Sequence, residues 1–147
     1  VELCKAAGVS RMAFYRNYNV KEEVFSRKLD ELVKQYWGTT AALVERGDLW
    51  YDLGHLTAFF EIMYENRKLV DSLFRCGFTW LLIQAIAGFL LDTWGNETPE
   101  ATCLLTGFAG FLCSCYEPWA EGGFKEEPRQ MAVLVNHFYR IPSERRK

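Results

Sequence analysis

Apolar side chains recur at spacings of three and four residues along most of the chain, and this spacing constrains the fold more than any other feature of the sequence. From Lys21 to about Arg46 the pattern continues without a proline, which is typical of one long amphipathic helix. The alternation of apolar and polar residues that marks a half-buried β-strand occurs nowhere in the sequence. The sequence therefore predicts an all-α fold.

Further helices are expected at 49–66, 68–75, 77–95, 98–119 and from 128 to about 139. Residues 78–94 are apolar on nearly every side, so this helix is expected to be central and wrapped by the others. Thr98, Pro99 and Glu100 supply a capping hydroxyl, a proline for the first helical position and a carboxylate near the positive helix end. Pro118 is expected to bend or end the helix that follows, and the chain after Pro142 is expected to fray.

The chain has 147 residues, of which 50% are apolar and 16% aromatic, enough for a substantial core in one or two compact units. The uncharged run from Cys76 to Leu91 is shorter than the roughly 18 apolar residues that a membrane span needs, and Gln84 interrupts it. We therefore interpret this run as a buried helix and expect no membrane partner.

Five cysteines form an odd number without the spacing of a disulfide framework, which indicates a reducing, cytoplasmic location. Cys113 and Cys115 lie two residues apart on a predicted helix, where they point in nearly opposite directions and cannot easily share a metal ion. They are expected to be buried as small hydrophobic side chains. No group of His, Cys and carboxylate residues has metal-ligand spacing, so we expect no metal and no cofactor.

Two short helices joined by a tight turn are predicted near the start of the chain. The first has apolar residues on one side and ends at Gly8, a residue that readily adopts the positive φ found after a helix. Ser10 is a favoured N-cap, so the second helix is expected from Arg11 to about Tyr18, and Lys21 is expected to open the next one. This arrangement is a helix-turn-helix, whose second helix enters the major groove of DNA.

A surface helix pair without nucleic acid is the alternative explanation, and composition alone favours it because such pairs also occur as ordinary packing. Charge gives modest support to DNA binding. Residues 1–34 carry seven Lys and Arg against five Asp and Glu, a net +2, whereas residues 35–147 carry ten against fourteen, a net −4. Binding through so small a positive charge would be sensitive to salt.

The same stretch resembles the tetracycline-repressor (TetR) family of one-component transcriptional regulators. The turn Gly8-Val9-Ser10, the pair Phe14-Tyr15 and the run Lys21-Glu22-Glu23 together carry the resemblance. It is strong over residues 1–26 and only architectural over the rest of the chain. It implies an all-helical homodimer in which a helix-turn-helix binds double-stranded operator DNA and a variable body binds a small effector that releases the operator.

The resemblance implies three parts: a helix-turn-helix DNA-binding domain at 1–26, a helical effector-binding and dimerisation domain at 27–141, and a tail at 142–147. Family members carry a further helix before this motif, so we expect the DNA-binding domain to be N-terminally incomplete in this chain. The residues that match the DNA-lining positions of the family are Ser10, Arg11, Met12, Ala13, Tyr15, Arg16, Asn17 and Lys21.

The last two long helices have apolar faces, which packing within one chain would explain on sequence alone. In the family the corresponding helices form a four-helix bundle about a twofold axis, which spaces the two DNA-binding helices over successive major grooves. The resemblance therefore implies a homodimer through residues 101–119 and 129–139. The expected interface residues are Leu104, Gly107, Phe108, Phe111, Trp119, Met131, Leu134 and Phe138.

An effector pocket is expected among the helices at 49–66, 68–75 and 77–95, which are rich in aromatic residues and poor in polar ones. Pockets for small molecules have this composition, but so do plain cores. Gln84 is the informative residue, because an amide buried in an apolar helix needs a hydrogen-bond partner. The expected pocket residues are His55, Phe59, Phe60, Met63, Tyr64, Trp80, Gln84 and Trp94, and the effector is expected to be apolar or aromatic.

Three functions are compatible with the sequence. The first is a ligand-responsive DNA-binding transcriptional regulator, a repressor that a small molecule releases from its operator. The second is a helical enzyme that uses Cys113 or His137, and it ranks lowest because no nucleophile, base and orienting group occur at a recognisable spacing. The third is a dimeric helical module that binds a ligand or a protein without binding DNA. We expect the first, and no enzymatic activity.

Overall fold

The structure is a computed structural model that describes the backbone of residues 11–144 and the side chains of these residues except 11, 14, 15 and 141–144. Within the described residues the chain forms six α-helices and no strand, so the predicted all-α class is confirmed. The first predicted helix, the turn after it and Ser10 lie outside the described residues. The helices are α2 (Arg11–Glu45), α3 (Leu53–Glu65), α4 (Arg67–Arg75), α5 (Thr79–Trp94), α6 (Pro99–Glu121) and α7 (Pro128–Glu144).

The start of α6 follows the predicted signals. The Thr98 side chain accepts a hydrogen bond from the Ala101 amide at 3.2 Å, and Pro99 occupies the first helical position. The predicted ends are less accurate, because Pro118 lies inside α6 and α7 continues past Pro142. Pro118 lacks a backbone N–H, but its carbonyl still accepts from Gly122 N at 2.9 Å, and α6 continues to Glu121.

The expected break between two helices at 11–18 and 21–46 is wrong, because residues 11–45 form a single helix of 35 residues. No glycine or proline occurs between Arg11 and Trp37, so the local sequence gives the helix no reason to stop at Asn19 or Val20. As a consequence Lys21 lies in a helix interior, where backbone amides bond within the helix. The expectation that Lys21 opens a new helix is therefore also wrong.

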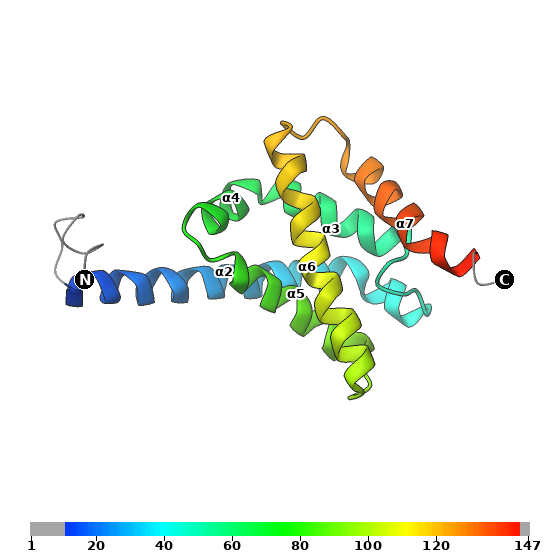
Figure 1. Cartoon of the computed structure of the whole chain (residues 1–147), viewed down its shortest axis with the longest axis horizontal. Coiled ribbons are helices and arrows are strands. Elements are labelled where there is room, and N and C mark those ends of the chain that lie inside the picture. Colours follow the sequence, from blue (N-terminus) through cyan, green and yellow to red (C-terminus); the bar gives the residue numbers. More distant parts are fainter. Residues whose placement is uncertain (1–10, 145–147) are drawn as a thin grey trace.

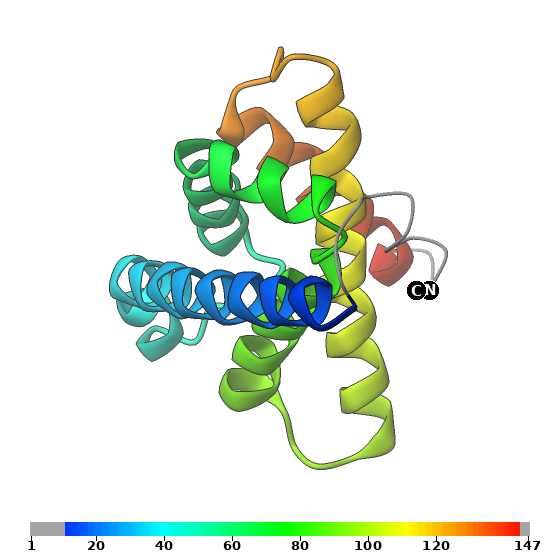
Figure 2. The same ribbon diagram turned by 90° about the vertical axis from the view of Figure 1, so that its left-hand side faces the viewer.

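The long helix α2 has two different halves. Its C-terminal half packs against α3 and α5, whereas its N-terminal half projects beyond the body of the molecule (Figure 1). Viewed nearly along α2, the other helices cover only part of its circumference (Figure 2). The projecting half is held by Tyr18 and Phe25, whose ring centroids lie 4.9 and 5.4 Å from that of Phe78.

The most deeply buried helix is α3 rather than α5. α3 buries seven of its thirteen residues and makes its main contacts with α7 and α2, while α5 packs mainly on α6 and α2. The expectation that α5 is wrapped on all sides is wrong, because Trp80 and Gln84 on this helix are exposed. Its uniform apolar composition did not reveal which side faces solvent, since exposed apolar residues are common on protein surfaces.

Candidate functional site

The predicted DNA-contacting residues lie on the projecting half of α2. Arg16, Asn17 and Lys21 are exposed, and Met12 is 75% exposed, whereas Ala13 is half-buried. Ser10 and the side chains of Arg11 and Tyr15 lie outside the described residues. The structure thus brings the described members together on one helix, with most of them facing solvent.

The charge on this projecting half is only moderately positive. Arg16, Lys21 and Lys28 are exposed cations, whereas Arg27 forms an ion pair with Glu23 one turn away. An exposed pair of this kind contributes little to stability, and it also reduces the positive potential that a phosphate would meet. The arrangement could therefore contact nucleic acid through a few side chains, but it does not form a strongly basic surface.

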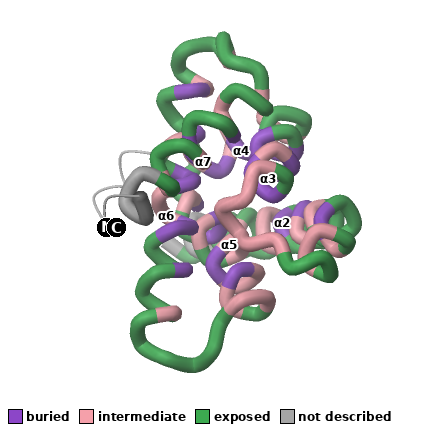
Figure 3. Tube along the Cα trace, turned by 90° about the vertical axis from the view of Figure 1, so that its right-hand side faces the viewer, coloured by how far each residue is buried: buried purple, intermediate pink, exposed green. Residues whose placement is uncertain are grey.

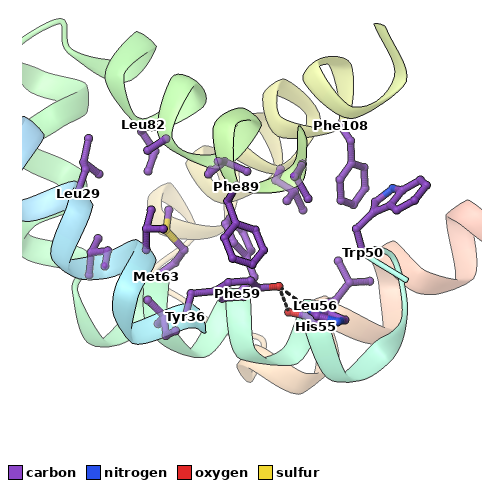
Figure 4. A pocket seen from close by; sticks show the side chains of 17 residues that line it. Leu29, Tyr36, Trp50, His55, Leu56, Phe59, Met63, Leu82, Phe89 and Phe108 are labelled. Carbon is purple, nitrogen blue, oxygen red and sulfur yellow. Dashed lines mark hydrogen bonds between the residues drawn. The ribbon is translucent and has the colours of Figure 1, made fainter. Parts of the chain in front are cut away.

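A cavity with a volume of about 70 Å³ lies between α2, α3, α5 and α6 (Figure 4). About 10–15 Å³ of such space holds one water molecule, so the cavity has room for a handful of waters or a small organic molecule. None of its lining residues is Lys, Arg, Asp or Glu. They are Leu29, Leu32, Val33, Tyr36, Trp50, His55, Leu56, Phe59, Ile62, Met63, Leu82, Ala85, Ile86, Phe89, Leu90, Phe108 and Leu112.

The structure brings together only part of the predicted pocket. His55, Phe59 and Met63 line the cavity. The other five residues do not line it. Phe60 is packed inside the core, and Trp94 is half-buried behind a cavity wall. Tyr64, Trp80 and Gln84 are exposed.

Gln84 requires a correction of its own. Its side chain is exposed, so the argument that a buried amide needs a partner does not apply to it. The cavity side of α5 is instead formed by Leu82, Ala85, Ile86 and Phe89.

Sequence reasoning missed the contribution of α2 to the cavity. Leu29, Leu32 and Tyr36 are spaced by three and four residues, so they share one face of α2 and form one wall. This periodicity was visible in the sequence. It did not identify a cavity, because the same spacing is typical of any helix that packs on a core.

The polar groups of the cavity lie at one end of it. Figure 4 shows Trp50 and His55 at one end, whereas Leu29 and Leu82 lie at the other. The Tyr36 hydroxyl lies 3.1 Å from His55 Nδ1 and donates to the His55 carbonyl oxygen at 3.2 Å. Burial raises the pKa of Tyr36 well above its usual value, so the phenol stays protonated.

His55 is fully buried, and burial lowers the pKa of its imidazole below the usual value. Asp48 and Asp52 oppose this shift but do not cancel it. The ring is therefore neutral at pH 7, with one nitrogen protonated and the other free to accept a hydrogen bond. Among the described side chains, His55 Nε2 and Trp50 Nε1 are the buried nitrogens that have no hydrogen-bond partner.

The segment before α3 fixes the position of Trp50. The Leu49 amide donates to Asp52 Oδ2 at 2.7 Å, and Asn136 of α7 donates to the Tyr51 carbonyl at 2.9 Å. These bonds anchor both residues adjacent to Trp50 in the chain. The indole is therefore held against the cavity by its own loop and by a helix distant in sequence.

Replacing Tyr36 with phenylalanine is expected to lower the free energy of unfolding by about 1–3 kcal/mol, because it leaves His55 Nδ1 buried without its partner. Urea denaturation of the two proteins measures the difference. Tyr64→Phe is the matched control, since Tyr64 is 38% exposed and water can solvate its hydroxyl. Equal losses in the two variants would contradict a specific role of the Tyr36–His55 contact.

The predicted interface residues divide into two groups. Phe108 and Trp119 are only 1% and 3% exposed, so they belong to the core of the single chain, and their assignment to a dimer interface is wrong. The physical reason is that they lie on the side of α6 that faces the core. The other six form what we call the α6–α7 face: Leu104, Gly107, Phe111, Met131, Leu134 and Phe138.

The α6–α7 face is apolar and substantially exposed. Leu104, Leu134 and Phe138 are 49%, 59% and 62% exposed, and Phe111 and Phe138 stack with ring centroids 5.9 Å apart. Figure 3 shows exposed positions along α7 and along the first turns of α6. Large exposed apolar side chains, linked across α6 and α7 by the contact between Phe111 and Phe138, are typical of an interaction site.

Cys113 and His137, the two residues considered for catalysis, lie in different environments. Burial raises the pKa of the Cys113 thiol to about 12, so it is not ionised near neutral pH, and His137 is exposed. Within residues 11–144, no three His, Cys, Asp or Glu side chains are grouped so that they could hold a metal ion. None of the helices in this part of the chain is long and apolar enough to cross a membrane.

Comparison with known proteins identifies no relative: no family model, no curated protein and no solved structure matches the chain.

Proposed function

We propose that this chain is a ligand-responsive, DNA-binding transcriptional regulator of the TetR type, acting as a cytoplasmic homodimer and released from its operator by a small molecule. The observation that carries the proposal is that one helix, α2, bears both the exposed residues Arg16, Asn17 and Lys21 and a wall of the cavity. The resemblance of residues 1–26 supplies the reason to connect these exposed residues with DNA.

The continuous helix offers a mechanism for the response. Arg16 and Tyr36 are separated by 20 residues of α2, or about 30 Å at 1.5 Å per residue. A ligand that contacts Leu29 and Tyr36 can favour one placement of α2 relative to α3 and α5. Because the projecting half belongs to the same helix, its position changes together with the cavity wall. Such a ligand lowers DNA affinity only if it binds better to the placement that fits DNA worse.

Dimerisation through the α6–α7 face is the second element of the proposal. The face is apolar, exposed and far along the chain from the projecting half of α2. A twofold pair made through it would carry two α2 helices at a fixed separation, as recognition of two half-sites requires.

The test is selection of bound DNA from a random pool by the protein in its full natural length. A recurring sequence is expected, and Arg16→Ala is expected to weaken binding and to reduce the salt dependence by about one phosphate contact. Lys125→Ala is the matched control, because Lys125 is an exposed cation in the loop between α6 and α7. If no sequence is enriched, or if the two variants weaken binding equally, the DNA-binding proposal is wrong.

A second candidate is a dimeric helical ligand-binding or protein-interaction module that does not bind DNA. Two observations favour it: α2 has no break between residues 18 and 21, and the chain carries a net charge of −2. This module would dimerise and bind a ligand but enrich no DNA sequence, so the same selection distinguishes the two functions.

A further inference from the structure

The cavity has a distinct polar end whose hydrogen-bonding capacity is incomplete. The Trp50 indole N–H can only donate, and the described structure gives it no acceptor. His55 Nε2 is also without a partner, and His55 is fully buried. A buried polar atom that lacks a hydrogen bond is costly, so two such atoms on residues that line one cavity indicate that a bound molecule supplies a partner.

The two atoms lie on rings that share a neighbour. The Trp94 ring packs edge-on against both, with centroid distances of 5.0 Å to His55 and 5.9 Å to Trp50. Trp94 thus supports the polar end from behind without lining the cavity. In Figure 4 both residues lie at the same end of the cavity, so the polar group of a ligand would bind at this end.

The charges around the polar end exclude an ionic ligand. No lining residue carries a formal charge that could pair with a buried carboxylate or ammonium group. Asp48 and Asp52 are close enough to influence His55, and they would repel an anion. Asp48 is itself paired with Arg46, Asp52 accepts from the Leu49 amide, and neither carboxylate lines the cavity where a cation would bind.

The remaining walls are apolar. Beyond Tyr36 and His55, the cavity extends toward Leu29 and Leu82 along aliphatic and aromatic side chains. A volume of about 70 Å³ corresponds to roughly five water molecules, which is the space of a small organic molecule. This combination of an apolar end, a polar end and no charge describes one chemical class of ligand.

We infer that the cavity binds a small, uncharged amphiphile: its hydroxyl oxygen accepts a hydrogen bond from Trp50 Nε1 at the polar end, and its hydrocarbon part extends toward Leu29 and Leu82. The inference rests on the proposed function in so far as this ligand is the effector, but binding itself does not require DNA.

The test uses 1-hexanol as the probe and two charged molecules of the same chain length, hexanoate and hexylammonium. Each is titrated into the isolated protein while the indole N–H resonances are followed by NMR. 1-Hexanol is expected to saturate and to shift the Trp50 resonance, and both charged molecules are expected to bind at least about tenfold more weakly because their charge would be buried without a partner.

Trp50→Phe keeps an aromatic ring and removes the donor, so it is expected to weaken 1-hexanol binding roughly three- to tenfold. Trp80→Phe is the matched control, since Trp80 is 39% exposed and does not line the cavity, and it is expected to leave binding unchanged. The unsubstituted protein provides the NMR readout if Trp50→Phe fails to fold.

The inference is overturned if 1-hexanol does not bind, if hexanoate or hexylammonium binds equally well, or if the Trp50 resonance does not move at saturation. These outcomes are independent of the DNA selection. A protein that binds 1-hexanol as described but enriches no DNA sequence is a ligand-binding module. A protein that enriches DNA but fails the titration is a regulator with a different effector site.

Discussion

Trp119→Ala is expected to lower the free energy of unfolding by about 3–5 kcal/mol, the range for removing a large aromatic side chain from a core. The Trp119 ring contacts Phe60 and Phe124 at centroid distances of 5.6 and 4.8 Å, and the side chain is 3% exposed. Its indole N–H donates to the Glu126 carbonyl at 2.9 Å, which closes the loop between α6 and α7. The substitution therefore leaves a cavity where α6 meets α3 and removes a loop contact.

Chemical denaturation of the purified variants measures this change. Trp119→Phe separates the two contributions, because it retains most of the ring contacts and loses only the bond to Glu126; it is expected to cost about 1–3 kcal/mol. Trp80→Ala is the surface control and is expected to cost much less. A loss below about 1 kcal/mol for Trp119→Ala would mean that this residue is not part of the packed core of the chain.

Helix positions were the part of the fold that the sequence predicted best. The periodic segments at 49–66, 68–75 and 98–119 correspond to α3, α4 and α6 within a few residues. The clearest local signal is the Thr98-Pro99 start of α6. Local signals were sufficient here because helix ends depend on a few neighbouring residues.

The continuity of α2 through Asn19 was missed although the local sequence is compatible with it, whereas the side of α5 that is buried depends on tertiary contacts and could not be predicted. Residues 18–21 contain no glycine or proline, so only packing from outside could bend the chain at that point. On α5 the sequence is apolar on nearly every side, and it does not reveal that Trp80 and Gln84 face solvent. Periodicity identifies which residues share a face but not which face another helix covers.

The cavity shows the same limitation at the level of the site. His55, Phe59 and Met63 follow one another at intervals of four residues on α3, so the sequence places them on one face. Tyr36 and Trp50 come from outside that helix. Only the folded chain reveals that the Tyr36 hydroxyl meets His55 and that Trp50 lies at the same end of the cavity.

Charge on the α6–α7 face is expected to abolish the proposed homodimer. Leu134 and Phe138 are 59% and 62% exposed and lie four residues apart on the same side of α7. Burying a leucine or phenylalanine contributes about 1.5–3 kcal/mol each, and in a twofold pair every contact occurs twice. Leu134→Glu combined with Phe138→Glu removes these contributions and adds four carboxylates to one interface. The dissociation constant is therefore expected to rise at least about a thousandfold, which corresponds to about 4 kcal/mol.

Light scattering and sedimentation over a concentration series measure the mass of each protein, and circular dichroism shows whether the double variant remains folded. Val133→Glu is the matched control, because Val133 is 47% exposed on the same helix but points about 100° away from Leu134. We expect the unsubstituted chain and Val133→Glu to be dimers at micromolar concentration and the double variant to be a folded monomer. A monomeric unsubstituted chain would refute the homodimer. A double variant that stays dimeric would place the interface on another surface, since a pair held through α6 and α7 cannot accommodate four buried, unpaired carboxylates.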